Sequence, residues 1–167
     1  MTCHTAGMGY VLNAVIAAEV LLRQAVRDLP EAVVVPLAHD FAMVPMTDEL
    51  FDSVSAGPSR SADDVFWKLP SGFGRVLAAW SNDGPVAYVE ADIFGGAGTQ
   101  TAQVWDGGAV VLGPLHLPEQ KPFPPMGSPI SQALRRLGAV KSQHFDEFEA
   151  VGLGRHRRME DWLDLAD

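Results

Sequence analysis

Cysteine, positive charge and long apolar runs are all scarce in this sequence, and each shortage narrows what the protein can be. Cys3 is the single cysteine, so no internal disulfide can form. The longest apolar segment, residues 11–22, is interrupted by Asn13 and Glu19 and is too short to span a bilayer. No basic region followed by an apolar stretch and a small-residue cleavage site opens the sequence. We therefore expect a cytoplasmic protein that does not insert into a membrane.

Positive charge is the second shortage. Lysine and arginine number 12 against 21 aspartates and glutamates, which gives a formal net charge of −9. General nucleic-acid binding is disfavoured, because a phosphate backbone calls for a basic face. The acidic balance permits a basic protein partner, although such a charge commonly does no more than keep a protein soluble.

The remaining composition is that of a globular chain. At 167 residues, with 47% hydrophobic and 20% charged residues, the chain can bury a sizeable core within one domain. No internal repeat or second core is visible. We expect a single α+β domain over residues 1–167, in which residues 1–9 are flexible because they show no periodicity.

Residues 85–113 carry the clearest strand pattern. The small and apolar residues Ala87, Val89, Ala91 and Ile93 alternate with polar or aromatic ones, which is typical of a strand with one buried face. Folding a hairpin about Gly95-Gly96-Ala97-Gly98 predicts these opposite pairs: Ala91 with Ala102, Val89 with Val104, Asp92 with Thr101, Glu90 with Gln103 and Tyr88 with Trp105. Residues 75–80 and 109–112 then add strands, so we predict a four-stranded antiparallel meander from about Arg75 to Gly113.

The rest of the chain predicts helices packed against that sheet. A helix is expected over residues 10–29, ended by Pro30 and docked on the sheet through Val15, Ala18, Leu22 and Val26. Residues 32–35 and 41–44 could form a hairpin with His39 and Asp40 in its turn. Further elements follow from turn and cap signals: a helix capped by Thr47, a mobile loop over 55–62, an extended proline-rich wrap over 114–125, a helix from Ser128 to Gly138, and a C-terminal helical region over 146–167 broken at Gly152 and Gly154.

The first candidate site lies on the other side of the predicted hairpin. Glu90 and Asp92 would lie about 7 Å apart on one side of a strand, a spacing that suits metal ligation or paired-carboxylate catalysis. No histidine pair or Cys-x-x-Cys accompanies them, so we predict no metal site and no catalytic residue there. Two aromatic residues beside carboxylates can instead anchor a partner. The predicted partner-binding surface therefore consists of Tyr88, Glu90, Asp92, Gln103 and Trp105.

The second candidate site is a pocket near the C-terminal end of the chain. Its residues would be His144, Asp146, Glu147, Arg155 and His156. Arg155-His156-Arg157-Arg158 is the only basic cluster and could pair with nearby acids or form a small anion site.

Neither nucleophile nor cofactor signals strengthen an enzymatic interpretation. There is no Gly-x-Ser-x-Gly, and the glycine turn at 95–98 leads into a strand rather than a helix, with no Gly-Lys-Ser/Thr after it. We predict a plain hairpin turn and no cofactor.

Several short motifs resemble a known group of sequences. The run from Phe94 to Gln100, Asp146-Glu147-Phe148, the run from Gly152 to Arg157 and Glu160-Asp161-Trp162 are similar to a group of small actinobacterial proteins of uncharacterised activity. The resemblance covers about Tyr10 to Leu163 and implies no catalytic residue. The size and acidic α+β character are also similar to those of immunity proteins that neutralise toxins.

Two functions therefore stay open. A non-catalytic protein-binding module, for example an immunity-like inhibitor, requires the five residues of the first site to be exposed together. A small-molecule binder or enzyme requires a concave pocket that buries Glu90 or Asp92 with His144 or His156 nearby. Because no catalytic signature is present, the binding module is the function we expect.

Overall fold

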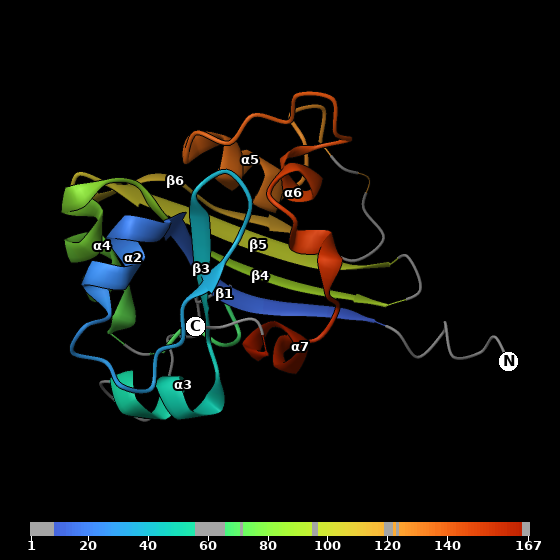
Figure 1. Cartoon of the computed structure of the whole chain (residues 1–167). Helices are drawn as coiled ribbons and strands as arrows, with labels where there is room; N and C mark the ends of the chain where they lie inside the picture. Colours follow the sequence, from blue (N-terminus) through green and yellow to red (C-terminus); the bar gives the residue numbers. More distant parts are fainter. Residues whose placement is uncertain are drawn as a thin grey trace, which may run out of the picture.

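A six-stranded antiparallel sheet in the order β2-β3-β1-β4-β5-β6 forms the centre of the structure, with helices on both of its faces (Figure 1). The computed structural model describes residues 9–55, 66–70, 72–94, 97–118, 122 and 124–164. In chain order the elements are β1 (Tyr10–Ala18), α2 (Glu19–Ala25), β2 (Val35–Pro36), β3 (Phe41–Pro45), α3 (Asp48–Val54), α4 (Phe73–Trp80), η1 (Ser81–Asp83), β4 (Val86–Phe94), β5 (Ala97–Asp106), β6 (Ala109–Leu117), α5 (Pro129–Arg136), α6 (Glu147–Ala150), η2 (Leu153–Arg155) and α7 (Met159–Leu163). The predicted α+β class and antiparallel sheet are confirmed. Within the described ranges, no helix combines the length and the apolar character needed to cross a membrane.

The first half of the predicted N-terminal helix is wrong, because residues 10–18 form β1. This strand lies inside the sheet, where Val15 is paired with Val44 of β3 on one side and with Tyr88 of β4 on the other. A strand that is buried on both faces reads as a continuous apolar run, and a short run of this kind cannot be distinguished from a buried helix by periodicity alone. The helix begins only at Glu19, where an ion pair of 2.8 Å with Arg23 supports its first turns.

The predicted docking of that helix is wrong for the same reason. Val15 and Ala18 belong to β1, and Leu22 is the one member of the predicted set that a helix buries in the core. Val26 lies just beyond the end of α2 and packs on the core only in part.

Residues 75–80 are also helical rather than extended. Helix α4 buries Phe73 and Leu77, which are four residues apart and therefore lie on one side of a helix. Gly72 precedes it in a left-handed conformation with a φ of 81°. The meander therefore has three strands, β4 to β6, and β1 takes the place beside β4 that the prediction gave to residues 75–80.

The β4–β5 hairpin has the predicted faces but a register shifted by two residues. Val89 pairs with Ala102, Glu90 with Thr101, and Tyr88 with Gln103. Phe94 pairs with Ala97, so only residues 95 and 96 connect the strands, whereas the prediction used four residues. A shift by two preserves the side of the sheet that each side chain occupies.

Strand β6 extends further than expected and forms one border of the sheet. It continues through Pro114 to Leu117, so the predicted proline-rich wrap begins too early. Proline is tolerated there because an edge strand has one side without ladder partners. Gly113, whose φ is 90°, precedes Pro114 at a place where a Cβ would come within 2.7 Å of the Ala102 carbonyl oxygen.

The predicted caps at Thr47 and Ser128 and the predicted turn at His39 and Asp40 are confirmed. Thr47 caps α3 by accepting the Leu50 N–H, and Ser128 caps α5 by accepting the Ser131 N–H. His39 and Asp40 form the β2–β3 turn with φ angles of 61° and 66°, although β2 is only two residues long. The C-terminal region, predicted as helix broken at Gly152 and Gly154, consists of the three short pieces α6, η2 and α7. Residues 1–8 and 56–62, expected to be flexible, lie outside the described residues.

The helices divide the core into two parts, one on each face of the sheet. On the α5 face, Leu12, Val89, Ala102 and Val104 of the sheet pack with Ile130, Leu134, Leu153 and Trp162. On the α4 face, Val15, Val86, Tyr88 and Trp105 of the sheet pack with Leu22, Leu50, Phe66, Phe73 and Leu77. The sheet is therefore covered on both faces.

Candidate functional site

The predicted partner-binding face is not an exposed surface. Tyr88, Glu90 and Trp105 are buried in the α4 face, and Gln103 is partly buried. Asp92, near the end of β4, is exposed. The expected joint exposure is wrong because α2, α3, α4 and the segment 66–70 form a second apolar layer over this face.

Glu90 has a structural partner that the sequence did not reveal. Its two carboxylate oxygens accept the backbone N–H groups of Trp67 at 2.8 Å and Lys68 at 2.7 Å. The Tyr88 hydroxyl donates to the Lys68 carbonyl at 2.6 Å. A buried carboxylate requires such donors, because they replace the water that it has lost. We call residues 66–70 the strap, since these bonds fix it across the α4 face.

The neighbours of Glu90 along the sheet are also polar. Asn13 on β1 and Thr101 on β5 lie directly opposite Glu90 in the sheet, and both are buried. The Thr101 hydroxyl lies 2.8 Å from Nδ1 of His116 on β6. Among the described residues, no three His, Cys, Asp or Glu side chains come together in a way that could hold a metal ion. Both oxygens of Glu90 are engaged by the main chain, so Glu90 serves to hold the strap.

The predicted C-terminal pocket divides into two parts. Its first part lies at α6, where each side chain is engaged locally. His144 Nδ1 lies 3.2 Å from Glu149, and Asp146 caps α6 by accepting the Glu149 N–H at 3.0 Å. Glu147 is buried and accepts two bonds from Arg135, at 3.0 and 3.3 Å. Burial alone would raise the pKa of Glu147, but the bonds from Arg135 and from its own backbone N–H, with the nearby positive charge, lower it overall.

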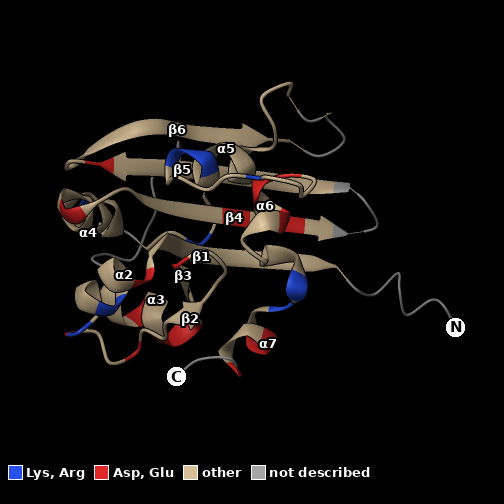
Figure 2. Cartoon of the chain, turned by 45° about the horizontal axis from the view of Figure 1, so that its top comes forward, with Lys and Arg blue, Asp and Glu red and all other residues tan. Residues whose placement is uncertain are grey.

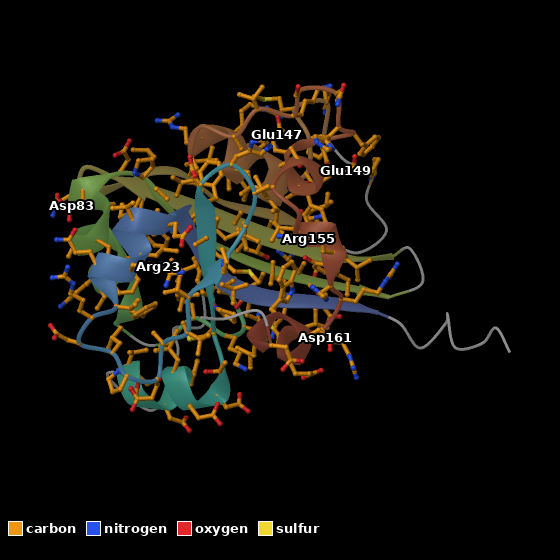
Figure 3. All side chains as sticks on the ribbon, viewed as in Figure 1. Arg23, Asp83, Glu147, Glu149, Arg155 and Asp161 are labelled. Carbon is orange, nitrogen blue, oxygen red and sulfur yellow. The ribbon has the colours of Figure 1, made fainter. Side chains whose placement is uncertain are left out.

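The second part of the predicted pocket is a groove. Arg155 and His156 line a space of about 640 Å³ together with Asp92, so the structure brings together three of the predicted site residues. We call this space the basic groove, and its other charged lining residues are Arg157, Arg158 and Asp161. Arg155 and Asp161 lie on the same side of the molecule, beside the end of β1 (Figure 3).

The basic segment is held firmly against the sheet. The Arg157 carbonyl accepts the Val11 N–H of β1 at 3.0 Å. The His156 ring stacks edge-on against the buried Trp162, with their centroids 4.8 Å apart. The Arg155 guanidinium lies over the same indole, 6.0 Å from its centroid. The groove is thus formed by the beginning of β1 and by the basic segment, residues 155–158, which is bonded to it.

A smaller hollow lies at the other end of α6. It measures about 280 Å³ and is lined by Pro124, Pro125, Met126, Gly127, Ser128, Arg135, Lys141, Phe145, Asp146 and Glu147. Phe145 is 77% exposed and Met126 is 64% exposed, and Val140, next to Lys141 in sequence, is 71% exposed. We call this place the apolar hollow. Large apolar side chains that gather in water are typical of a docking site.

The charged side chains around the apolar hollow differ in whether they have a bonding partner. Arg135 is bonded to Glu147, and Asp146 is bonded to the Glu149 N–H. Lys141 forms no salt bridge within the described part of the chain. The rim of the hollow therefore offers a cation while its acids already have partners.

Sequence reasoning missed Met126, Lys141 and Phe145. The available signal was an aromatic residue in a polar run, Lys141-Ser142-Gln143-His144-Phe145, and a methionine between prolines and glycine. Neither residue fits a helix or strand period, so neither has an obvious place in a core.

Comparison with known proteins finds no match. No family model matches the chain, and no curated protein or solved structure is significantly similar to it. The resemblance to actinobacterial and immunity proteins stays a prediction.

Proposed function

We propose that the protein is a non-catalytic binding module that docks an acidic partner protein on the apolar hollow. The observation that carries this proposal is the exposure of Phe145 beside Met126 at one concave place. Interfaces draw most of their affinity from a few aromatic and apolar anchors surrounded by a polar rim. Phe145 supplies the anchor, and Lys141 and Arg135 supply the rim.

The fold gives Phe145 no packing role that would explain its apolar side chain. Phe148, only three residues further along, packs on the α5 face and contacts Tyr10 with ring centroids 5.4 Å apart. Phe145 is instead left in water, at a cost that burial against a partner would remove. This contrast between two neighbouring phenylalanines supports a docking role for the exposed one.

Local charge favours an acidic partner over the basic partner that the net charge suggested. Six of the 12 lysines and arginines of the chain lie between Arg135 and Arg158, against three acidic residues in that span. Positive charge is visible on α5 and on the segment before α7 (Figure 2). A partner with carboxylates around an apolar protrusion would match this surface in both shape and sign.

The bonding of the buried carboxylates supports the non-catalytic part of the proposal. Glu90 is occupied by two main-chain N–H groups, and Glu147 is occupied by Arg135. A general acid or base must reach its substrate directly or through one water. Both groups are instead used to fix segments of the fold.

A photo-crosslinking residue placed at position 145 in the full-length protein would test the proposal in cells of the native host. The matched control is the same residue at position 20, because Val20 is equally exposed, at 79%, on α2 and does not line the apolar hollow. The captured partner is then purified and titrated with variants by calorimetry. We expect Phe145→Ala to weaken binding at least about tenfold, as for an interface anchor, and Val20→Ala to change it by less than about twofold. Equal affinity of Phe145→Ala and wild type would exclude the apolar hollow as the docking site.

The charge of the partner has its own test in the same titration. Lys141→Glu should weaken binding, and the loss should shrink as salt is added, because the rim is exposed and screened. Tighter binding by Lys141→Glu would show that the partner is basic.

A further inference from the structure

We propose that the basic groove is an oxyanion-binding site that takes a carboxylate or phosphate group of a ligand. This site is separate from the apolar hollow, because the two spaces share no lining residue. It also rests on different observations: three arginines that line one groove, a fixed backbone and a glycine that makes room for Arg155.

Four consecutive basic or imidazole side chains, residues 155–158, line the groove. Arginine presents several N–H donors in a planar fork that matches the two oxygens of a carboxylate or phosphate. Arg158 is already partly used, with contacts of 3.4 and 3.5 Å to Asp161. Arg155 has no carboxylate partner within the described residues; its Nε donates to the Gly152 carbonyl at 3.2 Å. Arg155 is therefore an arginine of the groove whose guanidinium N–H groups can bind an oxyanion.

Arg155 is held in place before any ligand arrives. Its guanidinium lies over Trp162, which is buried in the α5 face. Gly152 has a φ of 90°, and a Cβ there would come within 2.7 Å of Arg155 Nε. The glycine thus leaves the space that the guanidinium occupies. A side chain that is already ordered loses less entropy on binding, which favours affinity.

The main chain around the guanidinium is fixed as well. The carbonyl of Arg157 accepts the Val11 N–H, and the Asn13 N–H points to the Met159 sulfur at 3.5 Å. The basic segment therefore lies along the part of β1 that β3 does not reach, because the β1–β3 pairing begins only at Ala14. The bond to Val11 and the contact of Asn13 with Met159 hold residues 157–159 against β1.

The carboxylate of Asp92 provides a further test of the proposal. It lines the groove from β4, and its carboxylate has no hydrogen bond or ion pair with any described residue. A negative charge in the groove opposes an anion. Removing that charge should therefore improve the binding of a simple oxyanion, whereas a ligand that also carries a cation would lose a partner.

The test uses the full-length protein and ¹⁵N NMR titrations with sodium phosphate and with sodium acetate, each at constant ionic strength. We expect saturable shifts in the amides of residues 154–158 with at least one of the two probes, and the tighter probe identifies the phosphate or the carboxylate as the source. Arg155→Gln should weaken binding about fivefold, because a charge-assisted bond is lost. The matched control is Arg136→Gln, an exposed arginine on α5 that does not line the groove, and it should change the affinity by less than about 1.5-fold.

Asp92→Asn is the second variant, and it should strengthen binding about twofold. The proposal is overturned by the absence of saturable shifts at residues 154–158 with both probes, by equal losses in Arg155→Gln and Arg136→Gln, or by weaker binding of Asp92→Asn. None of these results tests the docking of a partner on the apolar hollow, because that proposal is tested by the affinity of Phe145→Ala for a protein partner.

Discussion

The α5 face and the α4 face of the sheet are built from the same strands but are covered in different ways. On the α5 face, apolar side chains of α5, η2 and α7 meet a mainly apolar sheet surface, in which the buried Gln100 accepts the Ile130 N–H of α5 at 3.1 Å. On the α4 face, the sheet presents Glu90, Thr101 and Asn13 beside its apolar residues, and the strap is fixed by hydrogen bonds to Glu90. Alternation along a strand therefore predicts which side chains share a face, but it does not predict whether a polar face is covered.

Each face also contains a buried tyrosine that holds a covering segment. Tyr10 donates its hydroxyl to the Leu153 carbonyl at 2.8 Å on the α5 face. Tyr88 donates to the Lys68 carbonyl at 2.6 Å on the α4 face. The two faces can thus be compared by matched substitutions.

The largest expected effect is the loss of a core leucine on either face. Leu134 of α5 and Leu77 of α4 are both fully buried. Leu134→Ala and Leu77→Ala should each lower the free energy of unfolding by about 2–5 kcal/mol, because both leave cavities. Urea denaturation measures both values. If Leu77→Ala costs no more than a surface substitution, the α4 face is not a second core.

The next effect concerns the buried carboxylate. Glu90→Gln keeps the size of the side chain but replaces one acceptor by an amide donor that faces a backbone N–H. We expect a loss of about 1–3 kcal/mol, the cost of leaving a buried polar group unsatisfied. Asp92→Asn is the control, because it makes the same change two residues away on the same side of β4 in an exposed position, and it should stay within about 0.5 kcal/mol. Equal values for the two variants would contradict the role of Glu90 in holding the strap.

Removing the hydroxyl of either tyrosine should have a smaller effect on stability, and the effect should be similar on the two faces. Tyr10→Phe and Tyr88→Phe each remove one hydrogen bond to a carbonyl, so each should cost about 0.5–1.5 kcal/mol. Amide hydrogen exchange should report the effects separately. Tyr88→Phe should speed exchange near residues 66–70, and Tyr10→Phe should speed it near residues 153–155. A change that appears in both places in both variants would show that the two faces open as one unit.

The smallest effect is the pH dependence that Glu147 contributes. Its pKa is lowered in the folded protein, so its contribution to stability is present above the unfolded pKa and is lost as the pH falls through the folded pKa. Arg135 is partly exposed, so we expect only about 0.2–1 kcal/mol. The difference in unfolding free energy between wild type and Glu147→Gln should shrink as the pH is lowered from about 6 to about 3. A difference that stays constant over this range would exclude the ion pair as its cause.

Much of the fold could be predicted because its signals are local. Caps at Thr47 and Ser128, the turn at His39 and the faces of the β4–β5 hairpin depend on neighbouring residues alone. The errors at β1 and α4 have a tertiary cause. Residues 10–18 form a strand because β3 and β4 pair with it on both sides, and no pattern within the segment records those partners.

The candidate site could be predicted only in part for a related reason. Asp92, Arg155 and His156 do line one groove, and the basic run at 155–158 was visible in the sequence. Phe145 and Met126 were not identified, because exposure is a property of the folded chain. An apolar residue in a loop contributes to a core in one fold and to a surface in another.

The docking of a protein on the apolar hollow can be tested most directly by hydrogen exchange of the complex with the captured partner. Amides at residues 126–127 and 140–149 should gain protection when the partner binds, while those of α3 and of the strap should exchange as they do in the free protein. Val20 of α2, which is 79% exposed and does not line the hollow, provides the internal reference. Protection that is concentrated on α2, α3 or the strap and absent from residues 140–149 would contradict the proposed function.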